Sequence, residues 1–181
     1  MDARNGLQVR RYWDLADVQC ETDMTEAEAK STLLTLLDDA TRIRMRSDAD
    51  FGAFLSGGLD SSSVVGLMSL YKTENLRSFS IGFDDQRFDE SEFARKAAER
   101  FGTVHQMQIM PVETTAKWPR FIWHCDQPHG DVSFIPTDQV SALAAQDVKM
   151  VLTGDGGDEL FAGYEKYLSL FPGGRVDHLK S

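Results

Sequence analysis

A short apolar run, a loop rich in glycine and serine, and a second apolar run follow one another within residues 51–70. The first run is Phe51–Leu55, the loop is Ser56–Ser62, and the second run, Val64–Leu70, is typical of a helix. A strand that turns through a glycine loop directly into a helix is the opening of a β–α–β unit. Because such units pack helices against a parallel sheet, this segment constrains the chain to an α/β fold.

Helices and strands continue to alternate along the rest of the chain. Thr25 and Glu28 form a capping-box pattern at the start of an amphipathic segment. Gly102 is placed to end a helix, whereas Pro119 predicts a break in another helix-like segment. We expect a doubly wound, mostly parallel sheet with helices on both faces. The elements predicted outside the loop region are helices over about 26–46, 91–101 and 136–146, and strands at 77–83, 104–110 and 149–153.

Composition argues against several functional classes. The 181 residues suggest one domain, and 19 basic against 29 acidic residues give a net charge of −10, which disfavours broad capture of nucleic acid or of an anionic membrane. Cys20 and Cys125 form no C-x-x-C pair, so neither a zinc knuckle nor a disulfide framework is indicated. Since no run approaches the roughly 18 apolar residues of a membrane span, we expect a cytoplasmic protein with no nucleic-acid or membrane partner.

The loop Ser56–Ser62 has the features of a phosphate-binding turn. Gly57 and Gly58 allow the backbone to adopt positive φ and to approach a ligand, and the following helix directs its N-terminal N–H groups at an anion. The loop matches neither the Walker pattern nor the dinucleotide G-x-G-x-x-G spacing. An ordinary glycine turn with serine caps is the alternative. However, Asp60 within a phosphate loop is electrostatically reasonable only if a cation lies between its carboxylate and the phosphates.

A second loop, within Leu152–Tyr164, follows another predicted strand and contains the acidic run Gly154–Glu159. In a parallel α/β sheet both loops emerge at the carboxyl edge, so Asp60 and Asp158 can face each other across a crevice. Two carboxylates would suit Mg²⁺, which prefers oxygen ligands and substrate phosphates. A calcium-type acidic turn or a solvated loop is the alternative, although the spacing lacks the twelve-residue pattern of an EF-hand.

Together the two loops resemble the synthetase domain of the glutamine-dependent asparagine synthetase family, within the N-type ATP pyrophosphatase or PP-loop superfamily. The resemblance extends from about Tyr12 to Tyr167. It implies the adenine nucleotide alpha hydrolase-like fold and a carbon–nitrogen ligase. The residues that carry it lie at 52–62, 78–83, 102–105 and 151–164.

The resemblance also implies roles for individual residues. Asp60 and Asp158 correspond to Mg²⁺ ligands, and Asp155 corresponds to a catalytic position where well-known members carry glutamate, whose side chain is one methylene longer. The positions that correspond to ATP contacts are Phe54, Ser56, Gly57, Gly58, Asp60, Ser61, Ser62, Ile81, Thr153 and Gly154.

The reaction implied by the resemblance converts aspartate to asparagine. The aspartate side-chain carboxylate attacks the α-phosphorus of ATP to form β-aspartyl-AMP and pyrophosphate, and ammonia derived from glutamine then displaces AMP. On this hypothesis residues 1–24 are an extended connector from a glutaminase domain that is absent here, and residues 25–181 are a partial, C-terminally truncated synthetase domain. We therefore expect the chain alone to complete the reaction poorly.

Two other functions stay open at this stage. One is a related ATP-dependent ligase that acts on another carboxylate, such as a β-lactam or lasso-peptide ring-closing enzyme or a polysaccharide amidotransferase. The other is a nucleotide-binding remnant without catalysis.

The remaining polar and aromatic clusters have structural interpretations. Asp89 and Glu90 are expected to serve the first turn of a helix, and Asp131 and Ser133, with Asp126, are candidates for an amino-acid pocket. The residues expected in loop packing are His124, Cys125, Asp126 and His129, and those expected in the core are Trp118, Phe121, Ile122 and Trp123.

Overall fold

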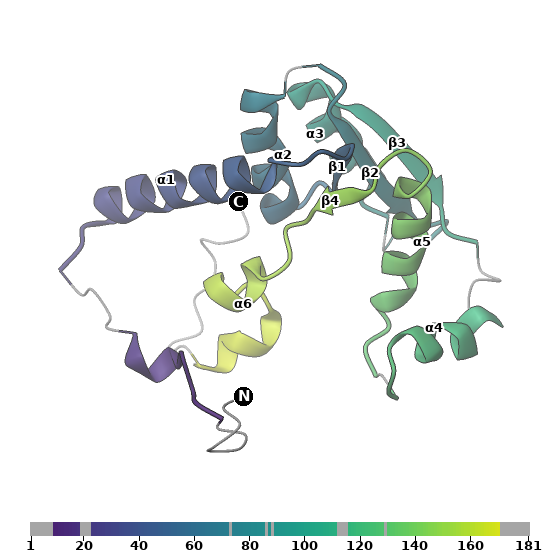
Figure 1. Cartoon of the computed structure of the whole chain (residues 1–181). Helices are drawn as coiled ribbons and strands as arrows, with labels where there is room; N and C mark the ends of the chain where they lie inside the picture. Colours follow the sequence, from purple (N-terminus) through teal and green to yellow (C-terminus); the bar gives the residue numbers. More distant parts are fainter. Residues whose placement is uncertain are drawn as a thin grey trace, which may run out of the picture. The chain divides into compact units, whose positions relative to one another are not determined.

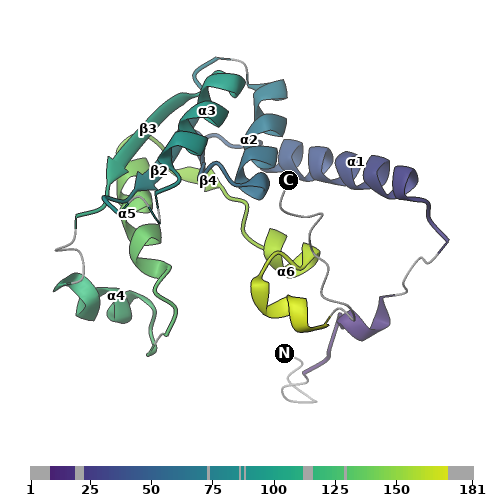
Figure 2. The same ribbon diagram turned by 180° about the vertical axis from the view of Figure 1, so that it is seen from behind.

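The computed structural model describes residues 9–18, 23–72, 74–85, 87, 89–111, 116–128 and 130–170. The chain divides into two compact units, residues 1–36 and 37–181, whose elements are labelled in Figures 1 and 2. None of the helices in these described ranges is long and apolar enough to cross a membrane. Cys20 and His129, named in the sequence analysis, lie outside the described residues.

The first unit contains a short 3-10 helix, η1 (Leu15–Asp17), and the beginning of helix α1 (Glu26–Arg44). The capping box is confirmed: the Thr25 backbone N–H donates to the Glu28 carboxylate (2.8 Å), and the Glu28 N–H donates to the Thr25 hydroxyl (3.3 Å). Within the segment expected to be an extended connector, Leu15–Asp17 form η1. There the Asp14 carboxylate accepts the Ala16 N–H (2.9 Å) and stabilises a turn.

A four-stranded parallel sheet forms the centre of the second unit. Its order is β3-β2-β1-β4, and each neighbouring pair is parallel, as the sequence predicted. The strands are β1 (Phe51–Phe54), β2 (Arg77–Gly82), β3 (Val104–Ile109) and β4 (Met150–Leu152).

Helices cover both faces of this sheet, which confirms the doubly wound fold class. Helices α2 and α3 lie on one face and α5 on the other (Figure 2). Gly102 ends α3 in the left-handed conformation (φ 65°), as expected. The helices are α2 (Leu59–Tyr71), α3 (Ser91–Phe101), α4 (Trp118–His124), α5 (Phe134–Ala144) and α6 (Gly157–Phe161), followed by the 3-10 helix η3 (Glu165–Leu170).

The two faces of the sheet bury separate hydrophobic clusters because successive residues of a strand point to opposite sides. In β1, Ala53 belongs to the cluster under α2 and α3, whereas Phe54 packs on the cluster under α5. The first cluster consists of Ala53, Leu55, Val65, Met68, Leu76, Ala98 and Leu152, and the second of Phe79, Val140, Ala144 and Val148.

The strand order places a topological switch point between β1 and β4. The chain proceeds from β1 to β2 to β3 in one direction, and β4 then pairs with the opposite edge of β1. The carboxyl ends of the strands at such a switch point are where open α/β sheets bind ligands.

Three local features of the structure bear on the sequence analysis. Pro119, where a break or two short pieces were expected, lies in the first turn of the short helix α4, where its missing N–H is tolerated. Trp123 is 78% exposed, so it is not a core residue, although Phe121 is buried. The acidic run after β4 contains α6, a helix that its glycine-rich sequence did not predict.

Candidate functional site

The loop between β1 and α2 is held together by its own serines. The Ser61 hydroxyl accepts the Ser56 backbone N–H (3.3 Å), lies 3.0 Å from the Ser56 hydroxyl, and donates to the Gly58 carbonyl (3.3 Å). Ser61 is buried, and its neighbour Ser62 has a buried hydroxyl with no partner among the described residues. Gly58, the N-cap of α2, provides no side-chain cap. The loop is thus preorganised around the N-terminus of a thirteen-residue helix, a typical anion-binding arrangement.

Gly57 fits this loop against the start of α3. Its φ is +88°, and a Cβ built there would lie 2.5 Å from the Phe93 carbonyl carbon. Because the clashing atom belongs to the backbone, it cannot move without shifting the start of α3. The close packing therefore explains why glycine is needed at this position.

The two predicted loops meet at the N-terminus of α2. A Cβ at Gly154, in the loop after β4, would lie 2.7 Å from the Ser61 backbone nitrogen and 2.9 Å from the Asp60 carbonyl carbon. A Cβ at Gly157, the first residue of α6, would overlap the Asp60 carboxylate. The loop after β4 is thus packed on the loop after β1, although about a hundred residues separate them in the chain.

Asp60 and Asp158 are close enough to influence each other's charge. Burial raises the pKa of Asp60 above its ordinary value, and the negative charge of Asp158 raises that pKa further. A cation between the two carboxylates would relieve this repulsion. The structure therefore brings together the two acids that the sequence placed on facing loops.

The donor set fits a hard divalent cation rather than zinc. Among the residues that the structure describes, no group of three or more His, Cys, Asp or Glu side chains is arranged to hold a metal. Zinc takes three or four such protein ligands. Mg²⁺, in contrast, commonly uses one or two carboxylates and completes its octahedron with water and substrate phosphates. Asp60 and Asp158 could supply these two carboxylates.

Asp155 is engaged within its own loop. Its carboxylate accepts a hydrogen bond from the Thr153 hydroxyl (2.8 Å), and its backbone N–H donates back to that hydroxyl (3.4 Å). The Asp155 side chain is exposed. In this conformation the residue orders Thr153 at the end of β4, and its predicted catalytic role stays a prediction.

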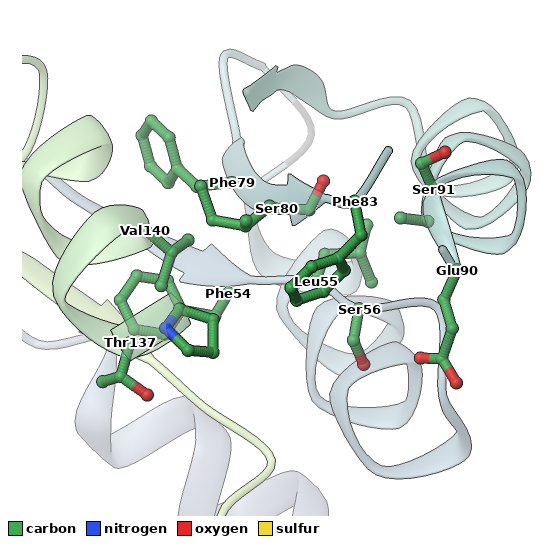
Figure 3. Close-up of a pocket in the computed structure, with 13 residues that line it drawn as sticks. Phe54, Leu55, Ser56, Phe79, Ser80, Phe83, Glu90, Ser91, Thr137 and Val140 are labelled. Carbon is green, nitrogen blue, oxygen red and sulfur yellow. The ribbon is translucent and has the colours of Figure 1, made fainter. Parts of the chain in front are cut away.

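A pocket of about 230 Å³ lies at the carboxyl ends of β1 and β2 (Figure 3). Side chains of α5 form one wall, and those at the start of α3 form the opposite wall. Three predicted ATP contacts, Phe54, Ser56 and Ile81, line it. Because Ser56 also belongs to the serine loop, the pocket adjoins that loop. The other lining residues are Leu55, Phe79, Ser80, Phe83, Glu90, Ser91, Ala94, Pro136, Thr137 and Val140.

Sequence reasoning missed most of the pocket walls. Phe83 directly follows β2, so the rule that ligands bind at the carboxyl ends of strands would have found it. Thr137 and Val140 carry no such signal, because only the packing of α5 against β2 brings them to the pocket. Seven other predicted contacts, at Gly57, Gly58, Asp60, Ser61, Ser62, Thr153 and Gly154, lie in the two loops and do not line this pocket.

Asp89 has the structural role expected of it at the start of α3. Its carboxylate accepts hydrogen bonds from the Ser91 hydroxyl (2.7 Å), the Phe83 N–H (3.2 Å) and the Ser91 N–H (3.3 Å). The Ser91 hydroxyl, followed by the Phe83 N–H, holds the pKa of Asp89 below its ordinary value. Its neighbour Glu90 instead lines the pocket.

Comparison with known proteins identifies a family for this chain. The family model described as asparagine synthase matches residues 32–176. The chain belongs to the asparagine synthase family. Both loops and every residue that lines the pocket lie within the range matched to the asparagine synthase model.

Individual relatives match large parts of the chain. A Methanocaldococcus jannaschii protein, provisionally named asparagine synthetase (glutamine-hydrolyzing) 2, is 40% identical over 173 residues, which cover 93% of this chain and 32% of that protein. Asparagine synthetase (glutamine-hydrolyzing) 1 of Bacillus subtilis is 36% identical over 163 residues, which cover 88% of this chain and 25% of that protein. The chain thus spans a third or less of the length of these two asparagine synthase relatives.

Among solved structures, an ammonia-dependent NAD synthetase from Campylobacter jejuni, in complex with a nitrate ion, is similar to this chain. Its TM-score is 0.47 at 14% sequence identity, and the match covers 78% of this chain and 61% of that one.

Proposed function

We propose that this chain carries the ATP-activating site of an amide-forming ligase that converts aspartate to asparagine. The observation that supports the proposal is the meeting of two loops at the switch point of the sheet. One loop carries the serine hydroxyls and Asp60, and the other carries Asp158. The membership of the asparagine synthase family supports the same choice of reaction.

The serine loop is the proposed binding site for the β- and γ-phosphates. The N-terminus of α2 contributes the positive end of its dipole, and Ser56, Ser61 and Ser62 contribute hydroxyl groups. The buried, unpartnered hydroxyl of Ser62 fits a donor whose acceptor arrives with the ligand. Asp60 and Asp158 would hold Mg²⁺ beside the phosphates, where the ion would neutralise their charge.

The pocket between α3 and α5 is the proposed site for the adenine and ribose. Its lining combines apolar side chains, such as Phe54 and Ile81, with hydroxyl and carboxylate groups at Thr137 and Glu90. Apolar walls with a few polar groups that fix orientation are typical of small-molecule pockets. Ser56 lies at both the pocket and the serine loop, so one nucleotide could extend from the first to the second.

The proposed reaction has two steps. In the first, an oxygen of the aspartate side-chain carboxylate forms a bond to the α-phosphorus of ATP. The bond from that phosphorus to the bridging oxygen breaks, and pyrophosphate leaves with the electron pair. In the second, ammonia forms a bond to the activated carbonyl carbon, loses a proton, and AMP leaves with the former carboxylate oxygen.

This chain's contribution would be to position the reactants and to stabilise phosphate charge. Asp155 is the proposed catalytic residue near the reacting carboxyl group. A glutaminase domain is the proposed partner that supplies ammonia from glutamine.

ATP binding by the full chain tests the site itself. We expect isothermal titration calorimetry to show Mg²⁺-dependent binding of ATP. Asp60→Asn and Asp158→Asn should each raise the Kd about tenfold or more in the presence of Mg²⁺. Asp48→Asn, an exposed and isosteric change between α1 and β1, should leave the Kd unchanged. Unchanged titrations in both site variants would refute the role of the carboxylate pair.

Pyrophosphate release tests the reaction. Release that requires aspartate and ammonium supports the proposal. Release only with a different carboxylate would replace it by a related ligase activity. If the chain binds ATP but releases no pyrophosphate under any of these conditions, it would be a nucleotide-binding protein without this catalytic activity.

A further inference from the structure

Two glycines lie directly against the carboxylates of the candidate metal site. We propose that Gly157 and Gly163 are positioning residues: the space left by their missing side chains holds Asp60 and Asp158, and this sets the affinity and selectivity for the divalent cation. The inference rests on the proposed function and adds two residues to which the family resemblance assigned no role.

Gly157 provides the space for Asp60. If Gly157 carried a Cβ, its three nearest atoms would all belong to the Asp60 carboxyl group, and the farthest of them, Oδ1, would be 2.9 Å away. The Asp60 carboxylate therefore lies directly on the backbone of the first residue of α6. Any side chain at residue 157 would force this carboxylate away from its present position.

Gly163 provides the corresponding space for Asp158. A Cβ at Gly163 would overlap the Asp158 Oδ1 and would lie 2.9 Å from its Cγ. The Gly163 N–H donates to the Asp158 carbonyl (3.0 Å), and Ala162, which precedes it, has a left-handed φ of 57°. The chain thus turns back over α6 and holds Gly163 against the carboxylate.

A further contact holds this turn in place. The Tyr164 hydroxyl donates to the Glu159 carboxylate (2.8 Å), which joins the residue after Gly163 to α6. The backbone of Gly163 is therefore fixed relative to Asp158 by a hydrogen bond on each side of the turn.

These two glycines differ from Gly57 and Gly154 in what an added Cβ would meet. At Gly57 and Gly154 the nearest atom is a backbone nitrogen, so alanine would push chain segments apart. The three nearest atoms at Gly157 and the two nearest at Gly163 belong to aspartate carboxyl groups, which can rotate; the third at Gly163 is the Asp158 Cα, at 3.2 Å. Neither residue has a left-handed φ. Alanine at either position should therefore displace a carboxylate and leave the fold intact.

A displaced carboxylate should affect Mg²⁺ more than Ca²⁺. Mg²⁺ requires nearly ideal octahedral geometry with short metal–oxygen distances, whereas Ca²⁺ accepts longer distances and irregular arrangements. The ratio of Mg²⁺-supported to Ca²⁺-supported nucleotide binding therefore reports the position of the carboxylates. A general loss of stability would not change that ratio.

The test uses the full chain with Gly157→Ala and Gly163→Ala, and with Gly130→Ala as the matched control. Among the residues that the structure describes, nothing lies within 4 Å of a Cβ at Gly130. The Kd of ATP is measured by calorimetry with Mg²⁺, with Ca²⁺ and with EDTA, and thermal unfolding is recorded for each variant. We expect about a tenfold weaker Mg²⁺-supported binding in both variants, a smaller loss with Ca²⁺, and no change with EDTA or in the control.

The possible results separate this inference from the proposed function. If the original chain binds ATP with no dependence on Mg²⁺, the proposed function and this inference both fail. If its binding depends on Mg²⁺ but the Gly157→Ala chain keeps the same Kd and the same ratio of Mg²⁺ to Ca²⁺, only this inference fails. If the Gly163→Ala chain does not fold, the Gly157→Ala chain alone tests the inference, because the three atoms nearest to its added Cβ all belong to the Asp60 carboxyl group.

Discussion

Gly57→Ala tests whether the serine loop is packed on α3 as the structure shows. Two separate penalties are expected. Alanine in a left-handed conformation costs about 1–2 kcal/mol, and Gly57 has a φ of +88°. A Cβ there would also lie 2.5 Å from the backbone carbon of Phe93, and such overpacking costs about 1–3 kcal/mol. The variant should therefore lose about 2–5 kcal/mol of unfolding free energy.

Two other glycines separate these penalties. Gly102 has a left-handed φ of 65° but open space around its Cβ position, so Gly102→Ala should show only the conformational cost of about 1–2 kcal/mol. Gly130 shows neither feature among the described residues, so Gly130→Ala should be neutral or stabilising by up to about 1 kcal/mol.

Urea unfolding followed by circular dichroism measures the three variants under the same conditions. The expected order of stability is Gly130→Ala, then Gly102→Ala, then Gly57→Ala. A Gly57→Ala chain that is as stable as the Gly102→Ala chain would show that the loop does not pack against the α3 backbone. The reasoning about the site geometry would then be wrong at its first step.

Two further predictions concern the sheet beneath the site. Burial lowers the pKa of His105 from its ordinary 6.5, so the unfolded chain takes up a proton first as the pH falls through 6.5, and the free energy of unfolding should decrease there. Urea unfolding at about pH 5.5 and about pH 7.5 should show this decrease in the original chain but not in His105→Gln; an equal decrease in both would exclude His105 as its source. Phe79 is fully buried and lines the pocket, so Phe79→Ala should cost about 3–5 kcal/mol in the same assay, and Phe79→Leu clearly less. Equal losses in these two variants would argue against the packing of Phe79 under α5.

The fold and the general position of the site could be predicted from the sequence because their signals are local. Helix α3 occupies the predicted range of residues 91–101, and Thr25 and Glu28 form the predicted cap. Strands β1 and β4 are short apolar runs, each followed by a glycine-containing loop, a pattern that involves only neighbouring residues. A topological rule about the carboxyl ends of parallel strands then sufficed to place Asp60 and Asp158 on facing loops.

Other features depend on residues that are distant in the chain. The wall of the pocket at Thr137 follows from the packing of α5 on β2, and no local pattern marks it. Helix α6 forms within a glycine-rich run whose helix propensity is low, so its neighbours must stabilise it. Trp123 was expected in the core because it is aromatic, but its side chain is exposed.

The sequence by itself thus determined the order of the elements, the parallel sheet and the two loops that carry the candidate ligands. Only the tertiary structure decided how closely those loops approach. The distance between them depends on the missing Cβ atoms of Gly154 and Gly157, each of which leaves space for atoms of Asp60 or Ser61 in the other loop. A side chain's absence is visible in the sequence, but what fills the space it leaves is a property of the packed chain.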